Sequence, residues 1–306
     1  MTEHLAARAS ARRHVLAEGP VWVADRSRVL WIDVERGSVF VGHLVDRWVE
    51  PVHQLDFDGR IGAAVPGDDG SILVATHDRL VVVEPDGQRT DGPTITGAGS
   101  GSRSNDGACD PRGRFVVGTL PLDEGAGRQQ ERLYRWELDG SLTVIDSDLM
   151  LSNGIAWSPD GSVMYSTDTM RGVVWARQYD VETGRLGPRR EHLHLVDGHP
   201  DGICVDARGH LWVAVWGGGE VRSFSPSGEP GDTVRVDAPH VSSVAFVGEH
   251  LETLLLTTAS RDLSPADLDR YPGAGCLFVA DVGVVGAPTT PWASATFLHR
   301  SDSTRN

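Results

Sequence analysis

Several features that mark other classes of protein are scarce in this chain. Its 306 residues include only three cysteines, Cys109, Cys204 and Cys276, whose wide spacing argues against a disulfide framework or a thiolate zinc site. No apolar run is long enough to span a membrane, and the first residues lack the apolar core of a secretory signal. Acidic residues outnumber basic ones, 43 to 28, which disfavours nucleic acid or an anionic membrane as a partner. These absences predict a cytoplasmic protein that binds a cation or a neutral small molecule.

Long amphipathic helical patterns are also absent, which argues against folds that place a helix between successive strands. The chain is instead rich in glycine, with 36 residues, many of them in turns that precede short apolar segments of strand character. Six such segments recur at intervals of 43 to 48 residues, and their marker positions are Leu30, Leu73, Val116, Met164, Trp212 and Leu255. Six repeats of this length are typical of a β-propeller.

We therefore expect an all-β fold, a single six-bladed β-propeller domain over residues 1–306 with four-stranded blades. No linker and no second domain are expected. The last blade of such a ring has to be closed by pairing the two ends of the chain. We expect a strand near residues 12–16 to lie beside C-terminal strands such as residues 295–299.

The first strand of each repeat aligns with the others as EGPV, IGAA, DGAC, NGIA, DGIC and SSVA. Equivalent positions in a propeller form a ring about the central channel, so Glu18, Asp106, Asn153 and Asp201 should converge although they lie far apart in the sequence. Like carboxylates crowded in one ring repel each other, and without a counter-charge one or more should stay protonated. The fourth position is always small, as expected near a crowded axis, and holds Val21, Ala64, Cys109, Ala156, Cys204 and Ala245. We interpret its two cysteines as buried apolar residues.

A bound cation would remove the repulsion within this ring and would form a metal site in the central channel. The predicted ligands are the carboxylates of Glu18 and Asp201 and the amide oxygen of Asn153. Such an oxygen set suits Ca²⁺ best, with Mn²⁺, Mg²⁺, Fe²⁺ and Zn²⁺ as alternatives. Three protein ligands leave positions for water or substrate, which is the condition for Lewis-acid catalysis. The alternative is that these polar–glycine pairs only form turns, an interpretation that explains Glu18 badly.

The third repeat has a polar approach to its first strand, GSGSRSNDGAC. Arg103 stands before the ring and can offer donors to substrate oxygens, or can instead form a salt bridge to Asp106 or a neighbour. Asn105 lies between them and is either a second substrate contact or a turn former. The sequence therefore places a candidate substrate-binding pair beside the candidate metal ligands.

Four ordered motifs resemble the regucalcin/gluconolactonase family: LAEGPVW from residue 16, RSNDGACDPRGRFVVGT from 103, SNGIAWSPDGSVMYSTDT from 152 and PDGICVDARGHLWVAVWGGGEV from 200. The resemblance implies a six-bladed propeller that binds one divalent metal on its axis and hydrolyses sugar lactones. It places metal ligands at Glu18, Asn153 and Asp201, with Asp201 also as the catalytic acid/base. It places substrate contacts at Arg103 and Asn105. A further family glutamate would fall near Asp123 or Glu124, and neither is assigned a role.

We therefore expect a divalent-metal-dependent lactonase that opens the ring of an aldono-lactone. Asp201 or a water activated by the cation would begin the reaction. Two alternatives remain open: a phosphotriesterase-like hydrolase of the diisopropyl-fluorophosphatase type, and a non-catalytic calcium-binding propeller. The sequence indicates neither the identity of the sugar nor the oligomeric state.

Overall fold

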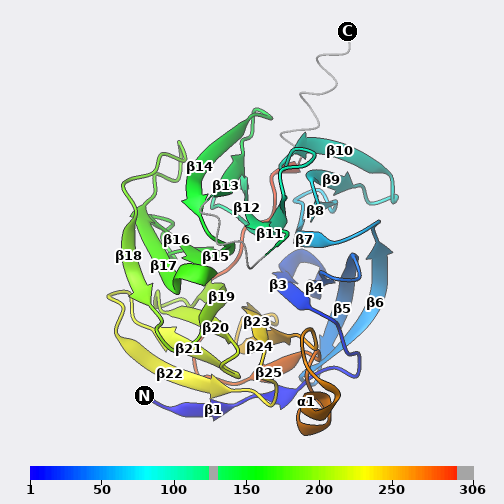
Figure 1. The fold of residues 1–306 in the computed structure, drawn as a ribbon, viewed down its shortest axis with the longest axis vertical. Coiled ribbons are helices and arrows are strands. Elements are labelled where there is room, and N and C mark those ends of the chain that lie inside the picture. The colour runs from blue at the N-terminus through cyan, green and yellow to red at the C-terminus, as the bar shows by residue number, and fades with distance from the viewer. Residues whose placement is uncertain (124–129, 295–306) are drawn as a thin grey trace.

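The computed structural model describes residues 1–123 and 130–294, whose strands form six sheets arranged as a ring around one axis (Figure 1). This confirms the prediction of an all-β, six-bladed propeller. Blades one to five are built on an antiparallel meander whose first strand lies nearest the axis, and blade six takes its outermost strand from the N-terminal segment (Figure 1). Within the described part of the chain no helix is long and apolar enough to cross a membrane, and α1 (Pro265–Arg270) is the one α-helix there.

Blades one to three follow one another along the chain. Blade one contains β3 (Ala17–Val23), β4 (Arg28–Asp33), β5 (Ser38–Val45) and β6 (Trp48–Asp56). Blade two contains β7 (Ile61–Pro66), β8 (Ile72–Thr76), β9 (Arg79–Val83) and β10 (Arg89–Thr94). Blade three contains β11 (Ser102–Cys109), β12 (Phe115–Pro121), β13 (Glu131–Trp136) and β14 (Leu142–Leu149). A short 3₁₀ helix, η1 (Ala24–Arg26), links the first two strands of blade one.

Blades four to six complete the ring. Blade four contains β15 (Ser152–Trp157), β16 (Val163–Asp168), β17 (Val173–Gln178) and β18 (Arg190–His194), with the 3₁₀ helix η3 (Thr169–Arg171) after β16. Blade five contains β19 (His199–Val205), β20 (Leu211–Trp216), β21 (Glu220–Phe224) and β22 (Pro230–Arg235), and β1 (Glu3–Leu5) adds a fifth strand parallel to β22. Blade six contains β23 (Val241–Val247), β24 (Thr253–Thr258), β25 (Phe278–Ala280) and β2 (Ala7–Arg8).

The ring is closed by other residues than the sequence predicted. The N-terminal strand of blade six is β2, which pairs antiparallel with β25, so the expected strand at residues 12–16 is wrong. That segment instead crosses from the outer edge of blade six to the inner edge of blade one. It is held by the buried His14, whose backbone N–H donates to Gly275 O at 2.7 Å and whose ring accepts from Trp31 Nε1 at 3.1 Å. Residues 295–299 lie outside the described residues.

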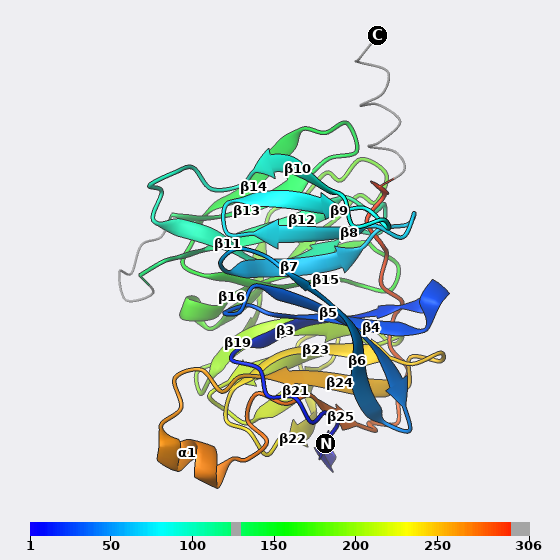
Figure 2. The same cartoon turned by 90° about the vertical axis from the view of Figure 1, so that its right-hand side faces the viewer.

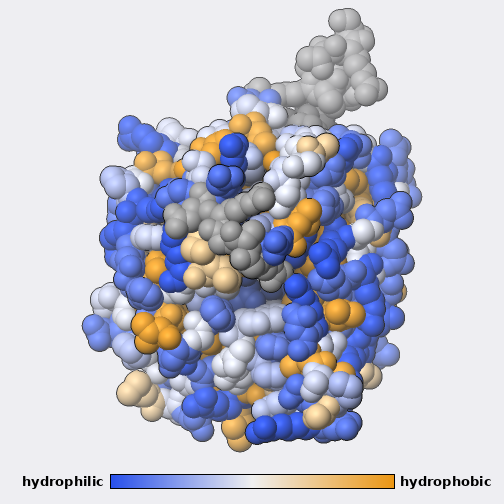
Figure 3. Space-filling model, in the orientation of Figure 1, coloured by the Kyte–Doolittle hydropathy of each residue, from blue (hydrophilic) through white to orange (hydrophobic). Residues whose placement is uncertain are grey.

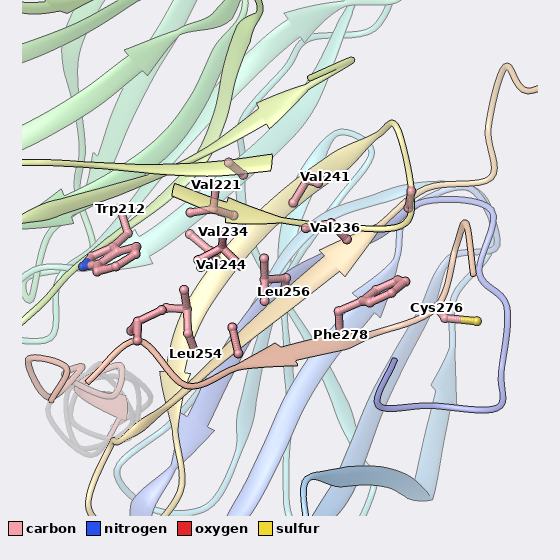
Figure 4. Packing of buried hydrophobic residues seen from close by; sticks show 14 of the residues in the cluster. Trp212, Val221, Val234, Val236, Val241, Val244, Leu254, Leu256, Cys276 and Phe278 are labelled. Atoms are coloured by element: carbon pink, nitrogen blue, oxygen red, sulfur yellow. The ribbon is translucent and has the colours of Figure 1, made fainter. Parts of the chain in front are cut away.

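The blades hold together through apolar side chains packed between neighbouring sheets. Figure 4 shows this packing between blades five and six, where Trp212 of β20 faces strands of the next blade. Its ring meets Phe246 edge-on, with centroids 6.0 Å apart. Because each sheet is covered on both faces, middle strands such as β20 and β24 read as continuous apolar runs rather than as an alternating pattern.

Residues 281–294, here called the C-terminal strap, run across one face of the ring (Figures 1 and 2). The strap leaves blade six and bonds to blade five, where Ala287 N donates to Val205 O at 3.0 Å. It then reaches blade two, where Trp292 N donates to Pro66 O at 2.8 Å. The opposite face carries α1 (Figure 2). The two faces of the ring therefore differ, and the predicted site residues lie on the face without the strap.

Candidate functional site

Every innermost strand has a β-bulge near its start, at the position where the sequence places the ring residue. The register shifts lie at Glu18/Val21, Ile61/Ala63, Ser104/Gly107, Asn153/Ile155, Pro200/Ile203 and Val241/Ser243. A bulge leaves one residue out of the hydrogen-bonded ladder and re-aims side chains. A carboxylate can therefore enter an otherwise apolar strand without pointing into the packing between blades.

In blades four and five the glycine that follows the polar residue has a steric cause, which is the close approach of the next blade. A Cβ on Gly154 would lie 2.4 Å from the carbonyl oxygen of Asp201, and one on Gly202 would lie 2.1 Å from Ser243 Oγ. No Cβ fits at such distances. The pairs Asn153–Gly154 and Asp201–Gly202 are thus contacts through which one inner strand packs against the next.

All five residues predicted to form the site line one cavity of about 230 Å³ at the start of the inner strands. Each of them is at most 9% exposed. Figure 3 shows the face onto which this end of the channel opens, with hydrophilic and hydrophobic residues interspersed. The cavity is lined by Leu16, Glu18, Val34, Arg103, Asn105, Leu120, Leu151, Asn153, Thr169, Met170, His199, Asp201, Trp216 and Arg261. The convergence of four blades at one cavity is what the repeat alignment predicted; the roles of the residues remain predictions.

Hydrogen bonds connect the predicted substrate pair to a predicted metal ligand. The Arg103 guanidinium donates to Ser104 O at 2.8 Å and to Asn105 Oδ1 at 3.3 Å. The Asn105 amide in turn donates to Ser152 O at 2.8 Å and to Asn153 Oδ1 at 3.3 Å. Asn105 is therefore more than a turn former, because it orients side chains on both sides of it.

Thr169 is a member of this network that the sequence analysis did not single out. Its hydroxyl accepts a hydrogen bond from Asn153 Nδ2 at 3.2 Å and donates to Pro200 O at 2.8 Å, beside Asp201. Since Asn153 Nδ2 is bound to Thr169, its Oδ1 faces the other side, toward Asn105. The only signal in the sequence was the position of this threonine directly after β16, at the end of the quoted third motif.

The carboxyl groups of the ring behave as expected for crowded acids. Burial, and then the neighbouring Asp106 charge, raise the pKa of Glu18 well above its ordinary value. Burial raises the pKa of Asp106 to about 6. Asp106 does not line the cavity, although its charge contributes to the raised pKa of Glu18. Burial disfavours the charged form of both groups, and the Arg103 charge offsets this only in part for Glu18.

The residues present fit a hard divalent cation. Glu18, Asn153 and Asp201 bring two carboxylates and one amide oxygen to a buried cavity, and a cation would offset the penalty carried by Glu18. Over residues 1–123 and 130–294 no three His, Cys, Asp or Glu side chains gather as a metal-binding group. The candidate set is consistent with that finding because only two of its members are of those types.

Three further cavity residues were not singled out by the sequence analysis. Trp216, at the end of β20, stacks on His240 with ring centroids 4.4 Å apart. Arg261 comes from the segment after β24, in the degenerate sixth repeat where the sequence has no motif. His199, two residues before Asp201, is exposed and lines the cavity. Asp123 is exposed, and Glu124 lies outside the described residues.

The other end of the channel holds a second cavity, of about 330 Å³, that contains none of the predicted site residues. Cys109 and Cys204 line it and pack against the core, but they are half-buried rather than buried as expected. The small side chains at this ring position leave space near the axis. Ala287 of the C-terminal strap forms one wall of the cavity that results. Burial raises the pKa of both thiols, which keeps them protonated and unreactive.

Comparisons with known proteins agree with this architecture. A family model described as the SMP-30/Gluconolactonase/LRE-like region matches residues 16–260. The chain is 34% identical over 280 residues to a pentonolactonase from Haloferax volcanii, covering 89% of this chain and 93% of that protein. It is 34% identical over 279 residues to a 6-deoxy-6-sulfogluconolactonase from Pseudomonas putida, with the same two coverages, 89% and 93%. The solved structure of a regucalcin from Agrobacterium tumefaciens, 24% identical, superposes with a TM-score of 0.88 over 95% of this chain and 99% of that one.

Proposed function

This chain belongs to the SMP-30/gluconolactonase/LRE-like family, and from that premise we propose that it hydrolyses the ring ester of a sugar lactone with the aid of one divalent cation. The observation that carries the proposal is the convergence of Glu18, Arg103, Asn105, Asn153 and Asp201 on one buried cavity. Relatives named as a pentonolactonase and a sulfogluconolactonase support the substrate class.

Glu18, Asn153 and Asp201 would hold the cation, and their all-oxygen donor set favours Ca²⁺ over Mn²⁺, Mg²⁺, Fe²⁺ and Zn²⁺. When bound, a divalent cation supplies Lewis-acid polarisation of the ester carbonyl. The chain contributes the orientation of the ligands. Thr169 turns the Asn153 amide so that its oxygen faces the channel side occupied by Asn105.

Arg103 and Asn105 would hold the sugar. Both are buried in the cavity wall and fixed by bonds to backbone carbonyls of Ser104 and Ser152. A guanidinium and an amide held in this way present donors to sugar hydroxyls without a large loss of side-chain entropy on binding. They would thereby position the ester against Asp201.

Asp201 would act as the acid/base. Its carboxylate takes a proton from the attacking water as the new C–O bond forms at the ester carbon, then delivers it to the ring oxygen as the ring C–O bond breaks. The product is an open-chain hydroxy acid, which releases one proton at neutral pH. The reaction needs no co-reactant other than water.

A pH-indicator assay of protein freed of metal by chelation, run against a panel of aldono-lactones with each divalent ion added back, tests the proposal. We expect activity that depends on the added ion, and a loss of on the order of 100-fold or more in kcat for Asp201→Asn. Cation affinity, measured by titration calorimetry, should fall in the same variant. The exposed Glu50→Gln on β6 is the matched control and should change neither quantity.

Three results would contradict the proposal in different ways. Full lactonase activity in Asp201→Asn would show that Asp201 is not the acid/base. Turnover of phosphorus esters but of no lactone would favour a phosphotriesterase-like hydrolase. Cation binding without turnover of either panel would favour a non-catalytic propeller.

A further inference from the structure

The second cavity, at the strap end of the channel, has the size and the lining of a small-molecule pocket. Its volume is about 330 Å³, and all six blades and the C-terminal strap contribute to its wall. The blades each supply small or apolar side chains, among them Val21, Val65, Ala108, Ala156, Ile203 and Ala245. Pockets that bind small molecules range from roughly 300 to 1,000 Å³ and have mainly apolar walls.

The strap side of this cavity is fixed by backbone hydrogen bonds. Ala287 N donates to Val205 O at 3.0 Å, and Val205 itself lines the cavity. Trp292 N donates to Pro66 O at 2.8 Å, and Pro66 lines it too. The strap is thus attached to blades five and two, which face each other across the axis. Pro288 between these bonds is exposed and lines the cavity, so the cavity is preformed and can be reached from solvent beside the strap.

The wall of this cavity offers no counter-charge to a charged ligand. Asp160 is the one charged side chain among the described residues that line it, and it is exposed. Its Oδ1 accepts hydrogen bonds from the hydroxyls of Ser158 and Ser162 at 2.6 and 2.9 Å. The thiols of Cys109 and Cys204 are neutral because burial raises the pKa of each. A charged molecule would lose its hydration here without compensation, so the cavity suits a neutral one.

One polar group of the wall residues lacks a partner. Trp157, at the end of β15, lines the cavity, and its indole N–H is buried with no acceptor in residues 1–123 and 130–294. The indole packs edge-on against the ring of Tyr179, with centroids 5.8 Å apart, which fixes its position. A buried donor without an acceptor is unfavourable, and an oxygen atom of a ligand that accepts from it would remove this cost.

We propose that this cavity binds a neutral, largely apolar molecule of about two fused rings, with a carbonyl oxygen that accepts a hydrogen bond from Trp157 Nε1. An apolar cavity of about 150 Å³ holds one benzene molecule, so about 330 Å³ has room for two fused rings. The site lies at the opposite end of the channel from the candidate cation ligands and does not depend on the proposed function. Its ligand binds whether or not a divalent cation is present.

The test compares 2-acetylnaphthalene with 2-isopropenylnaphthalene, two neutral molecules of nearly the same shape of which only the first carries a carbonyl oxygen. Equilibrium dialysis in the presence of a chelator measures both affinities. Wild-type protein should bind the ketone about 3- to 10-fold more tightly than the hydrocarbon, since one hydrogen bond is gained. In Trp157→Phe this preference should disappear through weaker binding of the ketone, while the affinity for the hydrocarbon stays within about twofold.

Trp175→Phe is the matched control. The indole N–H of Trp175 is also buried without an acceptor among the described residues, but Trp175 lies on β17 and does not line the cavity. This variant should leave both affinities unchanged. Ala156→Leu adds three carbon atoms to the cavity wall and should weaken both probes about 10-fold or more, because it fills the space they need. Thermal melts check that each variant is folded.

Absence of saturable binding of both probes to the wild type, or affinities that Ala156→Leu does not change, would overturn the site. Equal affinities for the two probes in the wild type, or a preference for the ketone that persists in Trp157→Phe, would overturn the hydrogen bond from Trp157. Because these measurements need neither a cation nor turnover, a failure of the lactonase assay would contradict only the proposed function.

Discussion

The carboxyl groups of Glu18 and Asp106 are buried in the channel, and burial raises the pKa of Glu18 more than the nearby Arg103 charge lowers it. Glu18 accepts a hydrogen bond from its neighbour Gly19 at 3.0 Å, and Asp106 accepts one from Gly107 at 2.7 Å. These single bonds do not offset burial, which is the largest cause of the raised pKa of each group. A divalent cation beside Glu18 would supply the missing charge, so protons and cation should compete.

The pKa of Asp106 predicts how the stability of the metal-free protein depends on pH. A group whose pKa is higher in the folded than in the unfolded state stabilises the fold at low pH, and this contribution is lost as pH rises through the folded pKa. Burial raises the pKa of Asp106 from 3.8 to about 6. Between pH 4 and pH 7 the free energy of unfolding of the wild type should therefore fall by about 2 kcal/mol relative to Asp106→Asn.

Urea denaturation of both proteins in the presence of a chelator measures this difference. A difference that stays constant across the range, or a wild type that gains stability relative to the variant as pH rises, would show that Asp106 is ionised in the folded protein throughout.

Two inner strands, β15 and β19, combine a polar side chain at the axis with close packing between neighbouring blades. Each of these strands brings a polar side chain to the axis while touching the next blade, and the bulge and the following glycine together allow both. Gly154 is the clearest case, because backbone atoms of Asp201 and Ile203 lie 2.4 and 2.8 Å from where its Cβ would be. The small residue in β15 thus sets the position of the proposed acid/base in β19.

Gly154→Ala should consequently affect both the fold and the site. The added methyl group forces β15 and β19 apart, at a cost of about 1 to 3 kcal/mol in the free energy of unfolding. Because Asp201 moves with β19, cation affinity should fall about 10-fold or more. Chemical denaturation and titration calorimetry measure the two effects.

Gly97→Ala is the matched control, since no atom lies within 4 Å of its Cβ position and its backbone is not left-handed. It should alter neither stability nor affinity. An unaltered cation affinity in Gly154→Ala would show that Gly154 does not set the position of Asp201.

Two segments hold the ring of blades closed, the N-terminal strands and the C-terminal strap. The N-terminal strands β1 and β2 join blades five and six, and the C-terminal strap ties blade six to blades five, two and three on the far face. Trp292, 3% exposed, anchors the strap by stacking on Trp136 of blade three at 5.2 Å. The strap and the candidate site lie at opposite ends of the axis, so closure and function should be separable.

Trp292→Ala tests this separation. Loss of the buried ring should lower the free energy of unfolding by about 3 to 5 kcal/mol, while cation affinity in the folded variant should stay within about twofold of wild type. Trp48→Ala on the exposed outer edge of blade one should cost less than about 1 kcal/mol. A large loss of cation affinity in Trp292→Ala would mean that the strap also holds the opposite end of the channel.

The features of this protein that recur in the blades could be predicted from its amino-acid sequence alone. The period of the apolar segments predicts six blades, since each blade must bury the same pattern against its neighbours. The same repetition places Glu18, Asn153 and Asp201 at equivalent positions, and equivalent positions of a ring converge on its axis. The number of blades and the convergence of these positions could therefore be predicted without knowledge of any contact between residues.

The features that occur once could not be predicted from the sequence, because they depend on how distant segments pack in the folded chain. The closing strand is Ala7–Arg8 rather than residues 12–16, because a two-residue outer strand has no period and its partner, β25, lies about 270 residues away. Thr169 and Arg261 reach the cavity from loops whose positions depend on hydrogen bonds to the adjacent blade. The second cavity, at the other end of the channel, is bounded on one side by the C-terminal strap, which has no counterpart in the repeats. A period in the sequence reports contacts that every blade repeats, whereas contacts made once depend on how the whole ring comes together.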